Sequence, residues 1–427
     1  MRTTPKSLRL QIGLFGRTNV GKSSFLNLVA GQEVSIISEV PGTTTDVVEK
    51  SMELLPVGPV VFLDTAGIDD VSVLAKKRIE KTQRIFDRAD VIVLIIEPDK
   101  WDVFEQNIAD EAKRRDIPVI IVVNKVDLVE PGQGFLAEIE NEFKQVLLCS
   151  STDPDNRDKV VHAFKAHVMS VCPDDFMDPP PLIGDLVPKG GLALFIIPID
   201  KEAPKGRIIL PQVQAMRDIL DHGQTVITCR ETEYTDTLKK LKNPPDLVVC
   251  DSQVVDKMVA ETPYGVKCTT FSILLARLKG DLTELVKGIA AIESLREEDK
   301  VLIAESCSHH AIEDDIGRIK IPRWLNSYKG FDVKWDVCSG RDYPQDLSTY
   351  KLIIHCGACM LTRREMLTRI EKAGEQGVFV TNYGICISMI HGVVERVLEP
   401  FPYALEAFKQ TKEVLSGGMG CLKKQLL

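Results

Sequence analysis

Short apolar runs alternate along the chain with longer amphipathic stretches. The apolar runs have the length and β-branched character of buried strands, whereas the stretches between them favour helices. Strands that alternate with helices predict parallel sheets covered by helices, which is the α/β fold class. The predicted strands are Leu10 to Phe15, Val60 to Leu63, Val119 to Val123, Leu192 to Ile199, Thr225 to Cys229, Asp246 to Cys250, Val301 to Glu305, Lys351 to Ile354 and Gly377 to Thr381. The predicted helices include one that begins at Ser23 and one over Gln212 to Leu220.

The length of the chain and one proline-rich segment predict three domains. At 427 residues the chain is too long for one ordinary core. Residues 173–181 read P-D-D-F-M-D-P-P-P, and three consecutive prolines disfavour helix and sheet alike. We therefore expect a first domain over residues 1–172, an α/β dimerisation or interaction domain over 173–266, and an α/β domain with a small parallel sheet over 267–427.

Composition and charge favour a soluble globular protein over a membrane protein or a nucleic-acid-binding protein. Hydrophobic residues make up 44% of the chain and charged residues 27%, which is typical of a soluble globular protein. No apolar run approaches the roughly 20 residues that a membrane helix needs, and Met1 to Leu8 form no apolar signal segment, so we expect a cytoplasmic location without a membrane. The net charge of −9 argues against a large nucleic-acid footprint.

The eleven cysteines are not expected to form a disulfide framework, because the cytosol keeps thiols reduced. Several lie in or beside apolar segments and need no role beyond that of small buried side chains. These are Cys149, Cys229, Cys250, Cys268 and Cys386.

Residues 16–24 form the most specific motif in the chain. They read G-x-x-x-x-G-K-S between a predicted strand and a predicted helix, which is the context of a phosphate-binding loop (P-loop). Backbone amides of such a loop surround the β-phosphate, Lys22 reaches the β and γ oxygens, and the Ser23 hydroxyl can ligate Mg²⁺ at the helix N-terminus. The expected phosphate-binding residues are Gly16, Asn19, Val20, Gly21, Lys22, Ser23 and Ser24.

Two further segments predict that the base is guanine. Asn124-Lys125-Val126-Asp127 ends a predicted strand, and the Asp127 carboxylate can accept from both N1 and the 2-amino group of guanine, whereas adenine offers no such pair of donors. Leu148-Cys149-Ser150-Ser151 resembles the last base-contacting loop, and we assign Ser150 to it. The expected base-binding residues are therefore Asn124, Lys125, Asp127 and Ser150.

Residues that respond to the γ-phosphate are expected on either side of the strand Val60 to Leu63. Asp64-Thr65-Ala66-Gly67 supplies the Asp64 carboxylate to hold Mg²⁺ through water and the Gly67 amide at the γ-phosphate. The preceding segment P-G-T-T-T-D, residues 41–46, supplies a hydroxyl that senses Mg²⁺ and the γ-phosphate, which we place on Thr44 with Thr43 and Thr45 as alternatives. For GTP hydrolysis the expected catalytic residues are Lys22, Ser23, Thr44, Asp64 and Gly67.

With these motifs, about the first 170 residues resemble the translation-factor-like small GTPases, and among them the tRNA-modifying and ribosome-assembly branch. Asn19 stands where potassium-activated relatives use an asparagine beside the phosphates, so a K⁺ requirement is one hypothesis and a purely structural role in the loop is the other. Ile68 stands where Ras-like enzymes carry a water-positioning glutamine, which implies slow intrinsic turnover.

A second chemical site is predicted where two strands of the third domain end. Cys307-Ser308-His309 follows one strand and His355-Cys356-Gly357-Ala358-Cys359 follows another. The carboxyl ends of parallel strands share one edge of a sheet, so these thiols and imidazoles can meet. A C-x-x-C pair alone is compatible with zinc, a redox dithiol or an iron–sulfur cluster. Three thiolates with an open fourth position favour a [4Fe–4S] cluster over zinc, and Cys338 is either a fourth thiol or a spare buried cysteine.

The order of a GTPase, a middle domain, C-x-H and then H-C-x-x-C resembles the [FeFe]-hydrogenase maturation GTPase family over essentially the whole chain. The resemblance implies a homodimeric scaffold and carrier with a [4Fe–4S] cluster, which receives a transient di-iron subcluster precursor from two radical-SAM maturases and passes it to the apo-[FeFe]-hydrogenase. It also implies that Cys307, Cys356 and Cys359 hold the cluster. His309 and His355 flank or complete the site, and the fourth ligand is His309, His355, Glu305 or an exogenous group.

Two other functions compete with this interpretation. One is a tRNA-modification or ribosome-assembly GTPase whose C-terminal half binds RNA, which the acidic composition disfavours. The other is a GTPase adaptor with a structural zinc site, which the identity of the metal would reveal.

Overall fold

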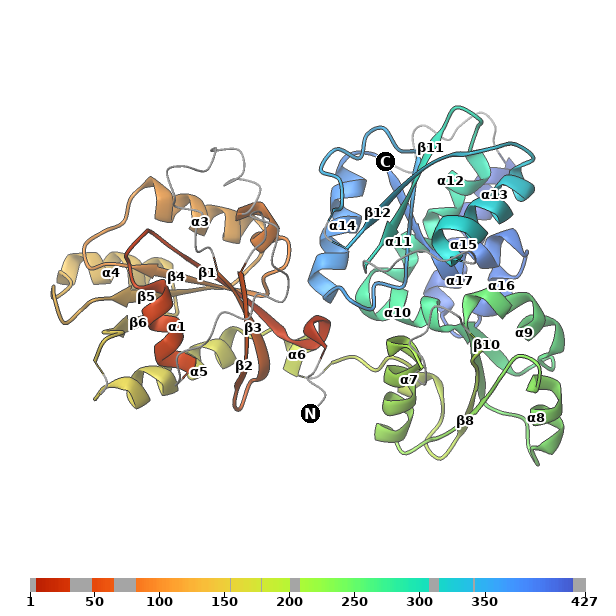
Figure 1. Ribbon diagram of the computed structural model, residues 1–427, viewed down its shortest axis with the longest axis horizontal. Helices are drawn as coiled ribbons and strands as arrows, with labels where there is room; N and C mark the ends of the chain where they lie inside the picture. The colour runs from red at the N-terminus through yellow and green to blue at the C-terminus, as the bar shows by residue number, and fades with distance from the viewer. Residues whose placement is uncertain are drawn as a thin grey trace. The chain divides into compact units, whose positions relative to one another are not determined.

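The computed structural model in Figure 1 describes residues 5–30, 48–64, 82–153, 155–177, 179–199, 208–306, 315–340 and 342–417. The chain divides into two compact units, Met1–Pro179 and Pro180–Leu427.

The first unit is built on a six-stranded sheet with the order β2-β3-β1-β4-β5-β6. All neighbouring strands are parallel except the antiparallel pair β2 and β3. The strands are β1 (Leu10–Gly16), β2 (Val48–Leu54), β3 (Gly58–Asp64), β4 (Val91–Ile96), β5 (Val119–Asn124) and β6 (Val146–Cys149). The helices that follow them are α1 (Lys22–Ala30), α3 (Val103–Arg114), α4 (Gln133–Glu142), α5 (Arg157–Val171) and α6 (Asp174–Met177).

Helices bury both faces of this sheet, which explains why its central strands β4 and β5 are apolar almost throughout. On one face, Leu10, Ile12 and Leu14 of β1 pack with Phe25 of α1 and Phe164 of α5. The other face forms a separate cluster with α3 and α4, and Figure 1 shows α1 and α3 on opposite sides of the sheet. The carboxyl ends of the parallel strands are therefore left as the edge where ligand-binding loops can lie.

The second unit contains two four-stranded parallel sheets, ordered β10-β9-β7-β8 and β12-β11-β13-β14. The strands are β7 (Leu192–Ile196), β8 (Thr225–Cys229), β9 (Leu247–Cys250), β10 (Lys267–Thr270), β11 (Lys300–Glu305), β12 (Lys334–Ser339), β13 (Leu352–His355) and β14 (Phe379–Asn382). Its helices are α7 (Leu210–Asp221), α8 (Tyr234–Lys240), α9 (Val255–Glu261), α10 (Phe271–Lys279), α11 (Leu282–Lys287), α12 (Ile289–Ser294), α13 (Ile321–Lys329), α14 (Arg363–Glu375), α15 (Tyr383–Ile390), α16 (Val394–Leu398) and α17 (Pro402–Gly417).

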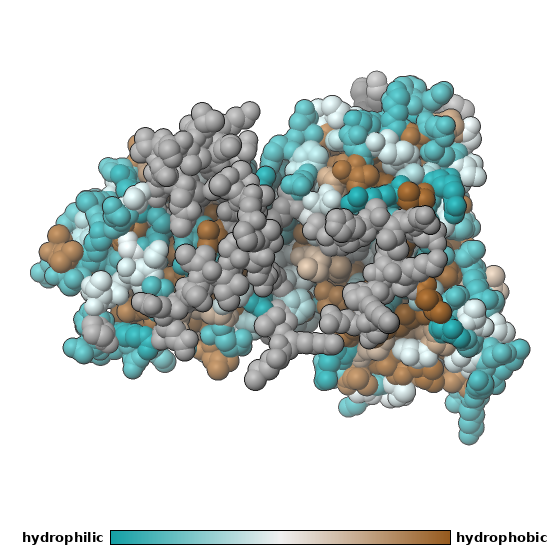
Figure 2. All heavy atoms as spheres, in the orientation of Figure 1, coloured by the Kyte–Doolittle hydropathy of each residue, from teal (hydrophilic) through white to brown (hydrophobic). Residues whose placement is uncertain are grey.

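One continuous hydrophobic core joins these two sheets. It extends from Leu182 to Phe408 and includes side chains of α10, such as Phe271 and Leu275, between them. Figure 2 shows a largely hydrophilic surface with smaller hydrophobic patches. Among the described residues, no helix is both long and apolar enough to cross a membrane.

The predicted α/β fold with a P-loop GTPase domain and parallel sheets is confirmed. Strands β4 and β6 were not predicted, and the predicted elements differ from the observed ones at their ends. The strand predicted over Leu192 to Ile199 ends at Ile196, and the helix predicted to begin at Ser23 begins at Lys22. Residues 174–177 of the predicted linker form the short helix α6, because the three prolines follow it. Strand β10 pairs with β9, so the second sheet extends past residue 266.

Candidate functional site

The P-loop follows β1 and turns sharply at two glycines. Gly16 has a φ of 149° and Gly21 a φ of 102°, values that side chains disfavour. A Cβ atom on Gly16 would lie 2.5 Å from the Ile95 carbonyl oxygen, and one on Gly21 would lie 2.2 Å from Asn124 Nδ2. Asn19 has a φ of 63°, a left-handed conformation that asparagine tolerates. The loop conformation thus depends on both glycines of the motif.

The Lys22 ammonium lies inside this loop. Its Nζ donates hydrogen bonds to the carbonyl oxygens of Gly16 (2.6 Å) and Arg17 (2.9 Å). Ser23 and Ser24 follow in the first turn of α1, and both are exposed. The geometry therefore gathers a cation, a hydroxyl and a helix N-terminus at one place, the combination that binds phosphate.

Asn124 connects the P-loop to the end of β6. Its Nδ2 donates to the Val20 carbonyl oxygen (2.7 Å), and its Oδ1 accepts from the Ser151 backbone N–H (3.1 Å) and the Ser151 hydroxyl (2.7 Å). The asparagine is buried, whereas Asp127 is exposed three residues later. Asn124 thus positions the loops, and the Asp127 carboxylate is left accessible to a base.

The sequence analysis missed the part played by Ser151. It assigned Ser150, whose buried hydroxyl has no hydrogen-bond partner among the described residues. Both serines sit directly after β6, so the motif alone could not distinguish the one that contacts Asn124.

Lys125 forms an ion pair with Glu97 at the end of β4, and Lys100 pairs with the same carboxylate. Hydrogen bonds from Lys100 and Lys125 hold the pKa of Glu97 below its usual value. Lys125 has a φ of 65°, so this loop also turns through a left-handed residue. Glu97 belongs to none of the motifs recognised in the sequence, so it was not predicted as a residue of the site.

Asp64 closes β3 and is 2% exposed. Its Oδ2 lies 3.7 Å from Lys50 Nζ, a residue of β2 that the sequence analysis also did not identify. Two other residues assigned to the γ-phosphate, Thr44 and Gly67, lie outside the described residues, as do the alternatives Thr43 and Thr45.

Strands β11 and β13, which precede the two thiol segments in the chain, end beside each other in the third sheet. Strands β11 and β13 are direct neighbours, with Ala304 opposite His355. Beyond them, the Ser306 backbone N–H donates to Cys356 Sγ (3.1 Å), and the Cys356 thiol donates to Ser306 Oγ (3.1 Å). Ser306 directly precedes Cys307 in the chain, although Cys307 and His309 themselves lie outside the described residues.

The second cysteine of the C-x-x-C segment is carried by a tight turn. Ala358 has a φ of 54° within it, and Cys359 follows with a partly exposed side chain. Within the described parts of the chain, no three His, Cys, Asp or Glu side chains gather as a metal site.

Both nitrogens of the His355 ring are engaged. The ring is fully buried, with Nδ1 3.0 Å from the Cys356 carbonyl oxygen and Nε2 3.0 Å from Arg369 Nη1. Because a guanidinium only donates, Nε2 accepts and Nδ1–H donates to the carbonyl. Burial, reinforced by the Arg369 charge, lowers the pKa of His355 to about 3. His355 is thus a neutral ring that supports the backbone of Cys356.

Two further candidates near this edge are also engaged or buried. Glu305 is 2% exposed, and its carboxylate forms an ion pair with Arg318 (2.8 Å). Cys338 lies on β12 opposite Ala304, and burial raises the pKa of its thiol to about 11. The geometry of Cys338 is that of a buried structural cysteine.

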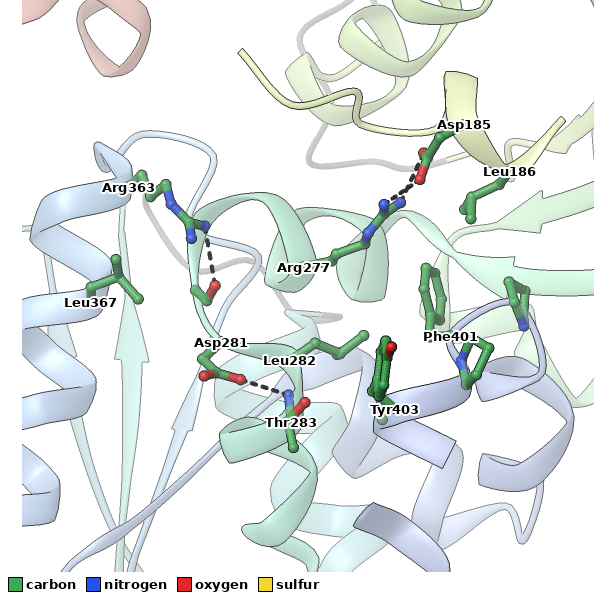
Figure 3. Close-up of a pocket in the computed structure, with 14 residues that line it drawn as sticks. Asp185, Leu186, Arg277, Asp281, Leu282, Thr283, Arg363, Leu367, Phe401 and Tyr403 are labelled. Carbon is green, nitrogen blue, oxygen red and sulfur yellow. Dashed lines mark hydrogen bonds and ion pairs between the residues drawn. The ribbon is translucent and has the colours of Figure 1, made fainter. Parts of the chain in front are cut away.

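A cavity of about 500 Å³ lies elsewhere in the second unit, between α10, α14 and the start of α17. Figure 3 shows that its charged side chains are engaged with each other or with the backbone. Arg277 pairs with Asp185 and lies 5.7 Å over the Phe401 ring. Arg363 donates to the backbone carbonyls of Leu278, near the end of α10, and Gly280, just after it. This cavity therefore lies between the parts of the unit built on the second and third sheets. Arg277 and Arg363 are already bound to groups of the protein there and connect these parts.

Three family models match the chain in succession. The 50S ribosome-binding GTPase model matches residues 11–125, the Hydrogen maturase F dimerization domain matches 182–280, and the Hydrogen maturase F tetramerization domain matches 283–400. The first match contains the P-loop, and the last contains Cys307, Cys356 and Cys359.

Curated relatives share part of the chain. The tRNA modification GTPase MnmE of Synechococcus sp. (strain JA-2-3B'a(2-13)) is 41% identical over 127 residues, which is 29% of this chain and 26% of the relative. MnmE of Acetivibrio thermocellus is 36% identical over 132 residues, 31% of this chain and 28% of the relative. The chain thus spans about a quarter to a third of the length of these relatives.

Solved structures match a similar share of the chain. A variant of Aquifex aeolicus Era bound to GDP·AlF4⁻ is 29% identical with a TM-score of 0.31 and covers 38% of this chain and 57% of its own. A probable GTP-binding protein, engB, is 22% identical with a TM-score of 0.30 and covers 38% of this chain and 99% of its own.

The MnmE relatives match no more than 38% of this chain, whereas the two Hydrogen maturase F models together match most of the second unit. A GTPase domain followed by these two domains is the arrangement of one family. The chain therefore belongs to the hydrogenase maturation GTPase family, hydrogen maturase F, with the GTPase domain in its first unit.

Proposed function

We propose that the protein hydrolyses GTP and serves as a [4Fe–4S] scaffold and carrier for the di-iron subcluster precursor of the [FeFe]-hydrogenase. It receives this precursor from two radical-SAM maturases and passes it to the apo-hydrogenase as a homodimer. The single observation that carries the proposal is the contact between Ser306 and Cys356, because it brings the residue before Cys307 to the C-x-x-C turn.

The chemistry of this edge fits a cluster. Iron–sulfur clusters are held by thiolates, and hydrogen bonds to their sulfurs tune the cluster. Cys356 is partly exposed, and its sulfur already accepts a backbone N–H, a kind of hydrogen bond that cluster-ligating sulfurs receive. The cluster would be held by Cys307, Cys356 and Cys359, and it would supply an iron at which a second metal-containing group can dock.

The fourth position is left to groups other than His355. Both of its ring nitrogens are engaged, so ligation would break its bond to Arg369 or to the Cys356 carbonyl. Glu305 would have to leave Arg318 to become a ligand. We therefore place His355 behind the site as a supporting residue, with His309, Glu305 or an exogenous group as the fourth ligand.

For GTP hydrolysis, the described residues supply a phosphate clamp. Lys22 would exchange its two carbonyl acceptors for phosphate oxygens, and the Ser23 hydroxyl and Asp64 carboxylate are the hard oxygen donors that Mg²⁺ prefers. When bound, Mg²⁺ neutralises charge that develops on the phosphates. Thr44 and Gly67 would complete the γ-phosphate contacts, and a K⁺ ion beside Asn19 is part of the same proposal.

The oligomer is supported by the two family models named for dimerization and tetramerization. In the dimerization segment, α7 exposes Val213 (45%) and Leu220 (56%). They stand seven positions apart in the sequence, which is about two helical turns, so they lie on the same helix face. We place the homodimer contact on this domain.

The test of the cluster is an anaerobic reconstitution with iron and sulfide, followed by reduction and EPR spectroscopy. We expect a [4Fe–4S]⁺ signal in the wild type and its loss in Cys356→Ser. Cys386→Ser, at a fully buried cysteine of α15, is the matched control and should keep the signal. Stoichiometric zinc in the untreated protein without any EPR signal would instead support the adaptor function.

Reciprocal variants test whether the two activities use separate sites. We expect Lys22→Ala to abolish GTP hydrolysis and keep the EPR signal, and Cys356→Ser to do the reverse. Loss of both activities in either folded variant would contradict the assignment of two sites.

A further inference from the structure

Lys50 contacts a carboxylate to which the proposed function gives a metal-holding role. Its Nζ lies 3.7 Å from Asp64 Oδ2, and the side chains of the two residues are 8% and 1% exposed. A buried charge lowers the stability of the fold unless an opposite charge lies beside it. The Lys50 ammonium and the Asp64 carboxylate therefore balance each other. The two residues lie on β2 and β3, which are hydrogen-bonded neighbours in the sheet.

The register of the hairpin directs the lysine to this position. Lys50 stands opposite Phe62 in the antiparallel pair, and directly opposed side chains share a face of the sheet. Asp64 lies two residues beyond Phe62 and therefore on the same face. Phe62 packs with Phe25 of α1, so this is the face that carries the P-loop helix. The long lysine side chain thus reaches diagonally from β2 to the carboxyl end of β3.

The neighbouring charges of β2 do not compete for Lys50. Glu49 lies on the other face of the sheet, where it forms an ion pair with Arg88 (2.8 Å). The side chains of Glu49 and Arg88 are each 10% exposed. Within the described residues, Asp64 is the carboxylate with which Lys50 forms an ion pair. The contact is therefore specific to the residue at the end of β3.

We propose that Lys50 is an exchangeable counter-ion of Asp64. Its ammonium balances the buried carboxylate while no nucleotide-bound metal is present, and it gives way when a divalent cation arrives with the nucleotide. Two cations within a few ångströms of one carboxylate repel each other, so Lys50 raises the Mg²⁺ concentration at which nucleotide is retained. The inference rests on the proposed role of Asp64 in holding Mg²⁺ and adds to it the group that the metal must displace.

The first experiment measures dissociation of a fluorescent GDP analogue as Mg²⁺ is titrated. In Lys50→Met, which keeps the length and apolar stem of the side chain, we expect the Mg²⁺ concentration for half-maximal retention to fall about tenfold. Lys50→Arg keeps the charge and should stay close to the wild type. Lys144→Met, at an exposed lysine before β6, is the control for general loss of positive charge. Equal Mg²⁺ midpoints in the wild type and Lys50→Met would overturn the inference.

A second experiment separates exchange from a merely structural pair. A double-mutant cycle of Lys50→Met and Asp64→Asn is measured by thermal unfolding, once without nucleotide and once with saturating Mg²⁺ and GDP. We expect the two substitutions to be coupled without nucleotide and uncoupled with it. Equal coupling in both conditions, or none in either, would contradict the exchange.

These readouts distinguish the two proposals. Mg²⁺-dependent binding of GDP by the wild type reports on the nucleotide site itself. The difference in Mg²⁺ midpoint between the wild type and Lys50→Met reports on Lys50. If the wild type binds GDP in a Mg²⁺-dependent way and Lys50→Met has the same midpoint, only the inference about Lys50 is wrong.

Discussion

At the residue scale, single buried charges shape the loop that receives the phosphates. The Arg17 guanidinium forms two hydrogen bonds with the Glu105 carboxylate, both 2.7 Å long, and lies 5.7 Å over the Phe104 ring. Glu105 also accepts from the Asp102 backbone N–H (3.0 Å) at the start of α3. The Asp102 carboxylate also accepts from Arg17 (2.9 Å), so two carboxylates fasten the P-loop to the start of α3, although Arg17 occupies a variable position of the G-x-x-x-x-G-K-S pattern.

The titration of Glu105 gives a testable pH dependence. Burial alone would raise the pKa of Glu105, but hydrogen bonds from Arg17 and from the backbone outweigh it and hold the pKa below the ordinary value of 4.5. A depressed pKa stabilises the fold fully above the ordinary value, and this contribution is lost as the pH falls from that value through the depressed pKa of the folded state. We expect Glu105→Gln to lower the free energy of unfolding at pH 7 by about 1–3 kcal/mol.

The same variant should also flatten the acid side of the stability profile. Urea unfolding between pH 7 and pH 4 measures both effects, and Glu138→Gln, at an exposed position of α4, is the control. Wild type and Glu105→Gln profiles that run parallel below pH 5 would show that the Arg17 pair does not account for the acid sensitivity.

At the element scale, three loops become one nucleotide site because β1, β4, β5 and β6 lie side by side in the sheet. Their carboxyl ends share an edge, and Asn124 joins the P-loop to the loop after β6 through its amide group. The third sheet uses the same geometry, since β11 and β13 end beside each other at Ser306 and Cys356. In both sheets, residues distant in sequence meet because parallel strands are neighbours.

Removal of the Asn124 amide tests this joint. Asn124→Ala deletes the hydrogen bonds to Val20 and Ser151, each worth about 1 kcal/mol, so we expect GTP affinity to fall at least about tenfold. Isothermal titration calorimetry with GDP and a GTP analogue measures the effect. Asn141→Ala, at an exposed residue of α4, should leave affinity unchanged. Unaltered affinity in Asn124→Ala would mean that the loops hold their positions without it.

At the scale of the whole molecule, the two units have separate interiors. The hydrophobic clusters of the first unit extend from Leu10 to Phe176, and the core of the second begins at Leu182. In the second unit, the pair between Arg277 and Asp185 and the shared core join the two sheets into one body. Each unit thus has the buried surface needed to fold independently.

A fragment of residues 180–427 tests this independence. Because the described core of this unit is built from its own residues, from Leu182 to Phe408, we expect the fragment to unfold cooperatively and to be reconstituted with the cluster, without GTP hydrolysis. Circular dichroism during thermal unfolding and the EPR signal of the reconstituted fragment measure both properties. A molten fragment without a cooperative transition would show that the second unit requires the GTPase domain.

Local patterns were sufficient for much of this protein. The apolar runs predicted six of the eight described strands of the second and third sheets, namely β7, β8, β9, β11, β13 and β14, with ends displaced by at most three residues. The P-loop could be recognised because its conformation requires positive φ angles at Gly16 and Gly21. Glycine adopts such angles readily, whereas residues with a side chain disfavour them. The α/β class and the GTPase followed from residues near each other in the chain, and the relation to hydrogenase maturation followed from the order of such local motifs along it.

Tertiary structure alone decided which side chains complete the sites. Lys50, Glu105 and Ser151 have no local signal, because each acts on a residue 14 or more positions away through strand register or packing. The role of His355 also depended on the fold: its position beside Cys356 made it a candidate ligand, but Arg369 on α14 engages its second nitrogen. Sequence determines which groups are present and how the nearby backbone turns, whereas burial and distant partners determine what each group is left free to do.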